Sequence, residues 1–255
     1  NDGEAYGSIR NCIIEDNFAW NLGGGICING RNNGSVAPVV QYCTFRYNSS
    51  RLDGGAYYKY GGSDIEFEKD IFGCKFFGNK GNRYGKVLYI QDAVGVDVVE
   101  IDSCEFRQNN LMSSITAIKK AGLIYVYYTR SDGLKFTYDS NIYAENSDES
   151  NCLEIINPVE LKPTKSIQIS NSTFTLKPAS WIALSLTDDK SSVDFRNCIV
   201  AGALINIGEC DTLCCLNNVF KDVGLYFDSK NIFKFNNNDY LGEFPNLLFT
   251  NDADL

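Results

Sequence analysis

A short motif recurs along this chain of 255 residues. It reads IRNCIIEDN, then VQYCTFRYN, IFGCKFFGN and IDSCEFRQN, with an apolar residue, a cysteine, a second apolar residue and an asparagine at fixed offsets. The cysteines of the four copies, Cys12, Cys43, Cys74 and Cys104, lie 31, 31 and 30 residues apart. A near-constant period of this length is typical of a solenoid, in which each repeat stacks on the one before it.

The same register continues beyond the fourth copy. With the cysteine as the reference position, the third residue before it and the second residue after it are apolar or aromatic in every copy. The reference position is occupied by Cys12, Cys43, Cys74, Cys104, Asn141, Ser172, Cys198, Asn218 and Asn238. The second residue after it is Ile14, Phe45, Phe76, Phe106, Tyr143, Phe174, Val200, Phe220 or Tyr240.

The residue just before the reference position predicts a corner. Side chains separated by an odd number of residues oppose each other in a straight strand, so both apolar positions can face inward only if the chain bends between them. Five of the nine residues at this site are asparagine and one is glycine, the types that best tolerate a left-handed backbone. They are Asn11, Tyr42, Gly73, Ser103, Ser140, Asn171, Asn197, Asn217 and Asn237.

A third strand follows each corner, as in GGGICI (23–28), GGAYYK (54–59) and GKVLYI (85–90). Three short strands per repeat without helical periodicity predict an all-β fold, a right-handed, single-stranded parallel β-helix of about nine coils. We expect one domain over residues 1–255, as a segment of a longer surface protein or a filament subunit. Longer repeats carry excursions after the third strand, which we expect to project from one side.

The cysteine column has two interpretations. It could be a redox, metal or disulfide system, or a ladder of small polarizable core residues. Asn and Ser replace cysteine in some repeats, which favours the ladder and predicts free thiols at Cys12, Cys43, Cys74, Cys104 and Cys198. The redox state of Cys210, Cys214 and Cys215 stays open.

The asparagines five residues after the reference position also allow two interpretations. They could bind a ligand through their amides, or stack as an internal ladder that satisfies buried carbonyls. The strand ends there at a turn, which favours the internal ladder. Its members are Asn17, Asn48, Asn79, Asn109 and Asn146. Of the three N-x-S/T triplets, this leaves Asn33 and Asn171 as candidate glycosylation sites and disfavours Asn48.

Composition excludes several functions. The chain has no histidine, which removes imidazole bases and histidine-ligated metals. Its net charge of −9 argues against binding to nucleic acid or to an anionic membrane surface. The sequence contains no apolar run of about 20 residues, so we expect no membrane insertion. Acidic pairs such as Asp188–Asp189 and Asp148–Glu149 could serve catalysis or calcium, but neighbouring surface carboxylates are usually only solvated. We therefore expect no catalytic residue, cofactor or metal.

Two motifs carry a family resemblance. FxxN appears as FRYN (45–48), FFGN (76–79) and FRQN (106–109), and a glycine motif appears as GGGI (23–26) and GGAY (54–57). Over residues 1–110 this phased alternation resembles the polymorphic membrane protein family of chlamydial-type surface proteins. The resemblance implies a right-handed β-helix, within the pectin-lyase-like superfamily, that is exported, displayed on a surface and often adhesive.

The expected function is thus a non-catalytic extracellular or cell-surface rod, acting as an adhesin or structural protein. The alternatives are a filament subunit that associates end to end and a polysaccharide lyase or glycoside hydrolase. The histidine-containing motif of polygalacturonases is missing, which disfavours the enzyme. A protein or glycan partner is expected on the excursions between residues 28 and 165, where tyrosines at 57, 58, 60, 125, 127 and 128 could stack on sugars.

Overall fold

Every regular element in the described part of the chain is a β-strand. The computed structural model describes residues 4–5, 7–30, 35–36, 38–61, 71–92, 98–109, 122–128, 134–144, 146, 152–156, 165–187, 191–210, 212–227, 232–241 and 247–249. The strands form two large sheets and two small ones, and all strand pairs among them are parallel.

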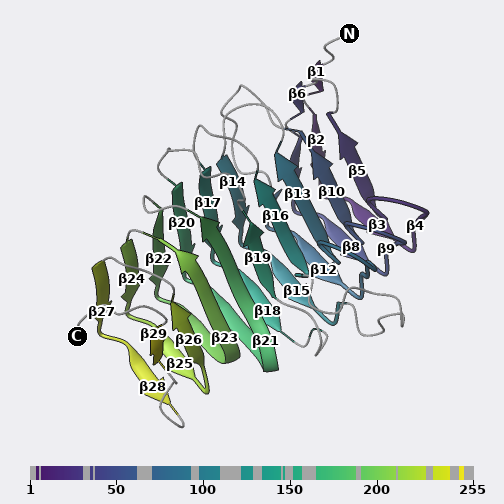
Figure 1. The fold of residues 1–255 in the computed structure, drawn as a ribbon. Helices are drawn as coiled ribbons and strands as arrows, with labels where there is room; N and C mark the ends of the chain where they lie inside the picture. Colours follow the sequence, from purple (N-terminus) through teal and green to yellow (C-terminus); the bar gives the residue numbers. More distant parts are fainter. Residues whose placement is uncertain are drawn as a thin grey trace.

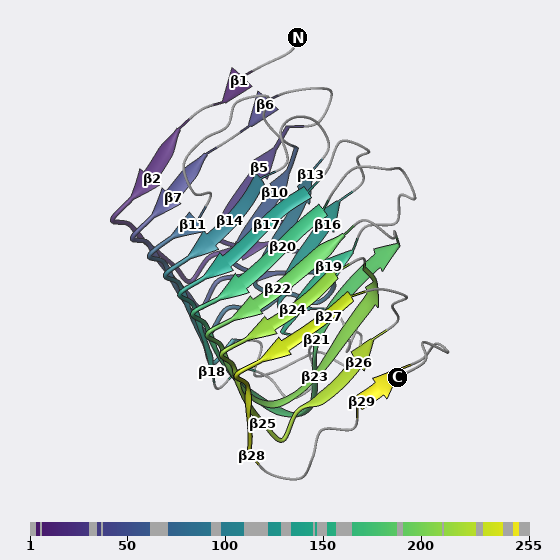
Figure 2. The same cartoon turned by 90° about the vertical axis from the view of Figure 1, so that its left-hand side faces the viewer.

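The first large sheet has nine strands, one from each successive repeat. They follow one another in chain order along the sheet, as Figure 2 shows. These strands are β2 (Ser8–Arg10), β7 (Val39–Gln41), β11 (Ile71–Phe72), β14 (Val98–Asp102), β17 (Leu134–Asp139), β20 (Lys165–Ser170), β22 (Ser192–Arg196), β24 (Thr212–Leu216) and β27 (Ile232–Asn236).

The second large sheet has 16 strands and forms two further faces. One face holds β3 (Ile13–Glu15), β8 (Thr44–Arg46), β12 (Lys75–Phe77), β15 (Glu105–Arg107), β18 (Ile142–Ala144), β25 (Val219–Lys221) and β28 (Asp239–Leu241). The other holds β5 (Ile26–Asn29), β10 (Tyr57–Tyr60), β13 (Leu88–Asp92), β16 (Ile124–Tyr128), β19 (Leu153–Ile156), β26 (Gly224–Phe227) and β29 (Leu247–Phe249). Two long strands, β21 (Thr173–Thr187) and β23 (Ile199–Glu209), pair with members of both faces and join them (Figure 1).

Each strand pairs with its counterpart one repeat away, so the chain winds as a parallel β-helix. Phe76, for example, lies in register with Phe45 on one side and Phe106 on the other. The small sheets follow the same rule, with β1 (Glu4–Ala5) beside β6 (Ser35–Val36) and β4 (Phe18–Ala19) beside β9 (Ser49–Ser50). The predicted fold class is confirmed, while the right hand and the number of coils stay predictions.

The corner before the reference position is also confirmed. All nine residues at this site have positive φ, between 49° for Asn171 and 62° for Gly73. This left-handed step lets the apolar residues on both sides of it face inward, as the odd spacing required. The turn expected at the end of the next strand is a second corner, with positive φ at Asp16, Tyr47 and Gly78, four residues after the reference position.

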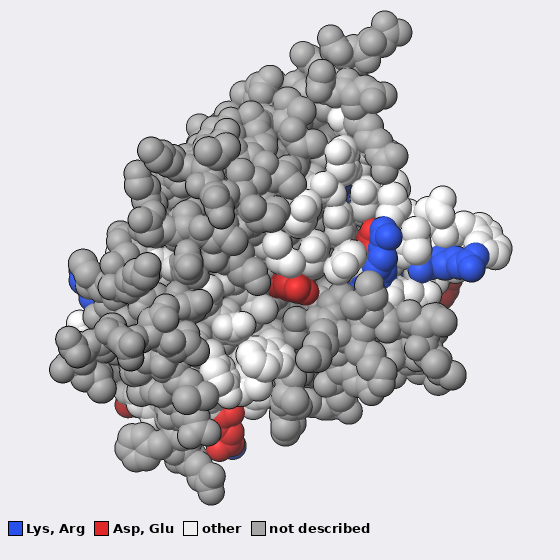
Figure 3. Space-filling view, viewed as in Figure 1, with Lys and Arg blue, Asp and Glu red and all other residues white. Residues whose placement is uncertain are grey.

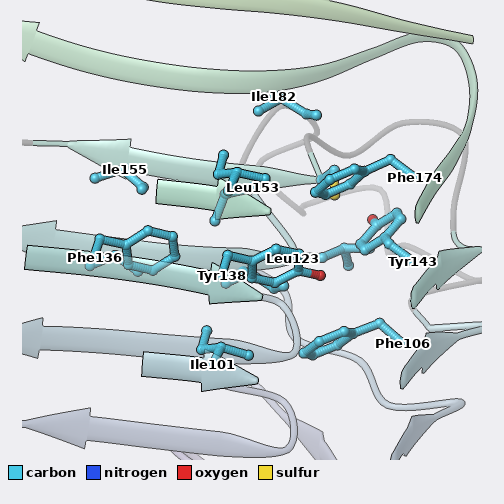
Figure 4. Close-up of a cluster of buried hydrophobic side chains, with 14 of the residues drawn as sticks. Ile101, Phe106, Leu123, Phe136, Tyr138, Tyr143, Leu153, Ile155, Phe174 and Ile182 are labelled. Carbon is cyan, nitrogen blue, oxygen red and sulfur yellow. The ribbon is translucent and has the colours of Figure 1, made fainter. Parts of the chain in front are cut away.

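Aromatic rings stack through the interior. The ring centroids of Phe45 and Phe76 lie 4.8 Å apart, as do those of Phe76 and Phe106. Tyr143 and Phe174 continue the column beyond them (Figure 4). Each of these rings is almost fully buried, which stabilises the fold by about 1.5–3 kcal/mol per side chain.

The outermost members of the columns are less buried. Cys12 and Asn17 are exposed, Ile14 is half-buried, and Tyr240 is 39% exposed. They keep the register of their columns, but no described coil covers them on their outer side.

Candidate functional site

The reference column is a hydrogen-bond ladder as well as a packing column. The N–H of Cys43 donates to Cys74 Sγ at 3.4 Å, and the N–H of Cys74 donates to Cys104 Sγ at 3.4 Å. The N–H of Cys104 then donates to Asn141 Oδ1 (2.8 Å), and that of Asn141 to Ser172 Oγ (3.1 Å). Cys, Asn and Ser therefore interchange because each supplies an acceptor to the preceding coil, a role that the packing interpretation missed.

Seven of the ten cysteines are buried, whereas Cys12 and Cys27 are exposed and Cys214 is half-buried. All ten cysteines are free. Burial raises the pKa of the Cys104 and Cys152 thiols well above 9.0, and it raises that of Cys198 to about 11. A buried thiol that stays protonated is a poor nucleophile and a poor metal ligand. Cys215 is buried beside half-buried Cys214, and burial raises its pKa also.

The asparagines stack inside the second corner. Asn48 Nδ2 donates to Asn79 Oδ1 at 3.0 Å, and Asn79 Nδ2 donates to Asn109 Oδ1 at 3.1 Å. The ladder extends to Asn17 at one end and to Asn146 at the other. Asn48, Asn79 and Asn109 are fully buried, so a glycan cannot be attached to Asn48 without unfolding this corner.

Several predicted features lie outside the described residues. They include Asn33, the acidic pairs Asp188–Asp189 and Asp148–Glu149, and large parts of the excursions between residues 28 and 165. Within the described ranges, no group of three or more Cys, Asp or Glu side chains is placed to hold a metal ion.

The tyrosines of the third strands do not form an open platform. Tyr57 points into the core, whereas Tyr58, Tyr89 and Tyr125 stack outside it with centroids 4.9 and 5.4 Å apart. The three outer rings are nevertheless only 4–8% exposed, because Tyr84 and neighbouring apolar side chains pack against them. This overturns the sugar-stacking interpretation for that column, since a ligand cannot reach the ring faces.

The outer face of the nine-stranded sheet contains a polar hollow of about 280 Å³. Side chains alternate along its strands, so the residues between the buried apolar ones face outward. Glu100 and Asp102 of β14 and Asp139 of β17 contribute carboxylates, and Gln168 and Ser170 of β20 contribute an amide and a hydroxyl. This face is turned toward the viewer in Figure 2.

The polar groups of this hollow are fixed by hydrogen bonds. Asp139 Oδ1 accepts from Ser170 Oγ at 2.6 Å and from Asn171 Nδ2 at 2.8 Å, and its Oδ2 accepts from Ser140 Oγ at 3.0 Å. Ser103 Oγ donates to Asp102 Oδ1 at 2.7 Å. Asn171, a candidate glycosylation site, is exposed and lines this hollow. A glycan attached to Asn171 would therefore compete with any ligand of the hollow.

The exposed corner continues the hollow as an amide ladder. Asn197 Nδ2 donates to Asn171 Oδ1 at 3.0 Å, and Asn217 Nδ2 donates to Asn197 Oδ1 at 3.3 Å. Arg196 also borders the hollow, but its guanidinium is paired with Asp194 on the same strand, with Nε–Oδ1 at 2.7 Å.

An aromatic pair, exposed Tyr42 and half-buried Phe72, lies next to the hollow along the sheet. Phe72 is in register with Asp102, one coil away. The ring of Tyr42 meets Phe72 edge-on at 5.2 Å and remains 55% exposed. It lies over Gly73, where an added Cβ would come within 2.7 Å of Cδ1 of the ring. The missing side chain at Gly73 therefore makes room for a flat tyrosine on the surface.

The second corner repeats this construction. Tyr47 meets Phe77 edge-on at 5.4 Å, lies over Gly78 and is 53% exposed. The residues beside it on the next face are charged, with Arg46 paired to Glu15. The same aromatic unit thus occurs once beside the polar hollow and once away from it.

The first coil carries another exposed aromatic pair. Phe18 and Trp20 are 58% and 69% exposed and meet edge-on at 5.5 Å. The guanidinium of Arg51 lies 5.5 Å above the Trp20 ring. Figure 3 shows basic and acidic side chains side by side along the edge where β4 lies, while much of the neighbouring described surface is uncharged.

Comparison with family models, with curated proteins and with solved structures gave no match. In the described part of the chain, no helix is long and apolar enough to cross a membrane. Function must therefore be argued from the hollow and from the aromatic residues beside it.

Proposed function

We propose that this chain is a non-catalytic rod, displayed outside the cell, that binds a partner along the outer face of the nine-stranded sheet. The observation that carries the proposal is the strip formed by Tyr42, Phe72 and the polar hollow. The motifs shared with surface-displayed β-helix proteins support the same location and an adhesive role.

The strip is preorganised for binding. Its side chains project from paired strands and corners, and hydrogen bonds within the strip hold Asp102, Asp139 and Asn171 in place. A site whose groups are fixed before the ligand arrives loses less side-chain freedom on binding.

The arrangement also favours binding over catalysis. Glycoside hydrolysis needs a carboxylic acid that donates a proton and a second carboxylate at a set distance from it. Both oxygens of Asp139 already accept hydrogen bonds from hydroxyl and amide donors, which suits a positioning role in ligand binding. The enzyme and filament alternatives remain predictions of the sequence, and neither has a described site to carry it.

The proposal is tested by coating beads with the purified chain and measuring their adhesion to cell and polysaccharide surfaces. We expect adhesion that Asp139→Asn and Tyr42→Asn weaken, together with unchanged polysaccharide chain length after prolonged incubation. Release of new reducing ends by the purified chain would overturn the non-catalytic part. Adhesion that neither substitution alters would overturn the assignment to this face.

A further inference from the structure

We propose that the strip takes a neutral or amino-bearing oligosaccharide, with one sugar ring on Tyr42 and the following units along the polar hollow. This inference rests on the proposed function and names its ligand class. It follows from the shape of the aromatic platform, the spacing of the polar groups and the charge of the strip.

The platform suits a pyranose ring. A sugar ring has an apolar C–H face and a polar rim, so it gains by covering a flat aromatic surface that has hydrogen-bonding groups at its edge. Tyr42 presents such a surface, because Gly73 and the edge of Phe72 support the ring from the protein side. Asp102 and Ser103 lie on the next coil, beside Phe72 and Gly73.

The polar groups repeat at a sugar-like interval. From Phe72 the same outward position is taken by Asp102, Asp139, Ser170 and Arg196 on successive coils. Successive strands lie about 4.8 Å apart, close to the length of one hexose in an extended chain. Asp102 and Ser170 are only 6% and 4% exposed, so an oligosaccharide that runs along the helix axis meets chiefly Asp139 and Arg196 among these side chains.

The charge of the strip selects among sugars. Its hollow is lined by three carboxylates, those of Glu100, Asp102 and Asp139, and by one guanidinium, that of Arg196, so its formal charge is negative. Carboxylates accept hydrogen bonds from hydroxyls and attract ammonium groups, but they repel uronates and sialic acids. Neutral and amino sugars are thus favoured and acidic glycans disfavoured.

The backbone conformation of Tyr42 is unusual for a tyrosine. It has φ of 54°, a conformation in which a bulky residue is unusual, and asparagine, serine or glycine occupies the equivalent corner in the other repeats. Asparagine at this site is therefore compatible with the fold. Tyr42→Asn removes the ring without disturbing the corner.

The test is calorimetric titration of the purified chain with three sets of oligosaccharides. They are neutral oligomers of glucose, mannose or N-acetylglucosamine, oligomers of glucosamine, and oligomers of galacturonate. Tyr47→Asn is the matched control, because it removes the same exposed ring, also over a glycine and beside a phenylalanine, from the corner away from the hollow. Circular dichroism and thermal melting verify that each variant is folded.

We expect at least one neutral or glucosamine oligomer to bind and galacturonate oligomers not to bind. Tyr42→Asn should weaken binding about tenfold or more, and Asp139→Asn should weaken it in the same direction, while Tyr47→Asn should change it by less than about twofold. Equal effects of the two tyrosine substitutions, a preference for galacturonate, or no binding of any neutral or amino oligomer would overturn the inference.

The two proposals fail separately. Adhesion of coated beads that depends on Asp139, without binding of any tested oligosaccharide, would leave the proposed function standing and remove the ligand class. Oligosaccharide binding at Tyr42 by a chain that supports no adhesion would support the ligand class and remove the proposed adhesive function.

Discussion

Removing one buried asparagine from the interior ladder should destabilise the protein far more than removing its exposed counterpart. Asn79 is fully buried, and its Oδ1 accepts from both the N–H and the Nδ2 of Asn48 at 3.0 Å. Its Nδ2 donates to the carbonyl of Phe45 at 2.9 Å and to Asn109 Oδ1 at 3.1 Å. Asn79→Ala removes all four interactions.

The cost follows from the groups left behind. A buried backbone N–H without a partner costs about 1–3 kcal/mol, and each further hydrogen bond lost costs about 1 kcal/mol. The N–H of Asn48 loses its acceptor, and three further hydrogen bonds disappear, one from Asn48 Nδ2 and two that Asn79 donates. The free energy of unfolding should therefore fall by about 4–6 kcal/mol.

Asn17→Ala is the matched control at the exposed end of the same ladder. Its Nδ2 makes one partly exposed bond to Asn48 Oδ1 at 3.0 Å, so its loss should cost about 0.5–1 kcal/mol. Urea unfolding followed by far-UV circular dichroism and by tryptophan fluorescence gives both values. Coincident curves from the two probes are needed, because long repeat arrays can unfold in parts. A difference between the variants below about 1 kcal/mol would refute the ladder's structural role.

Three further predictions concern the thiols and buried phenols. In urea unfolding, Cys74→Ser should lower the free energy of unfolding by about 1–3 kcal/mol less than Cys74→Val, because only serine keeps an acceptor for the N–H of Cys43 on the preceding coil. Equal stabilities of the two variants would mean that the cysteine column contributes only packing. In the native protein, iodoacetamide should modify exposed Cys12 and Cys27 first, and a mass spectrum of the unreduced protein that shows bridged column cysteines would contradict free thiols. Burial raises the pKa of Cys104 and Tyr138, so the unfolded chain loses protons first and stability should fall as the pH rises above about 9; a constant free energy of unfolding up to pH 11 would contradict this.

The interior of this fold could be predicted from the sequence because every repeat obeys the same packing constraints. An inward position must be apolar in each coil, and a left-handed corner favours asparagine or glycine. The same residue pattern therefore recurs in nine repeats and can be recognised in the sequence. This is why the corner residues from Asn11 to Asn237 were found without a structure. The hydrogen-bond acceptor role of the reference column could be recognised only from distances in the structure, such as that between the Cys43 N–H and Cys74 Sγ.

The outer surface could not be predicted in this way. Outward residues such as Glu100 and Asp139 do not have to be of one type in every coil. Their polar side chains therefore give the same sequence pattern as any solvated strand face. The burial of Tyr125 depends on Tyr84, whose ring centroid lies 4.9 Å from that of Tyr125. Only the tyrosine at position 42 gave a signal, because an aromatic residue replaced the usual asparagine at a left-handed corner.

A crystal structure of the chain with its tightest-binding neutral or amino oligosaccharide tests the central claim most directly. We predict an intact sugar chain that runs along the helix axis, with one ring on Tyr42 and hydroxyl or ammonium groups on Glu100 and Asp139. Sugar bound instead over Trp20 or on the face of β10 and β13, or a ligand cut into shorter products, would contradict the account.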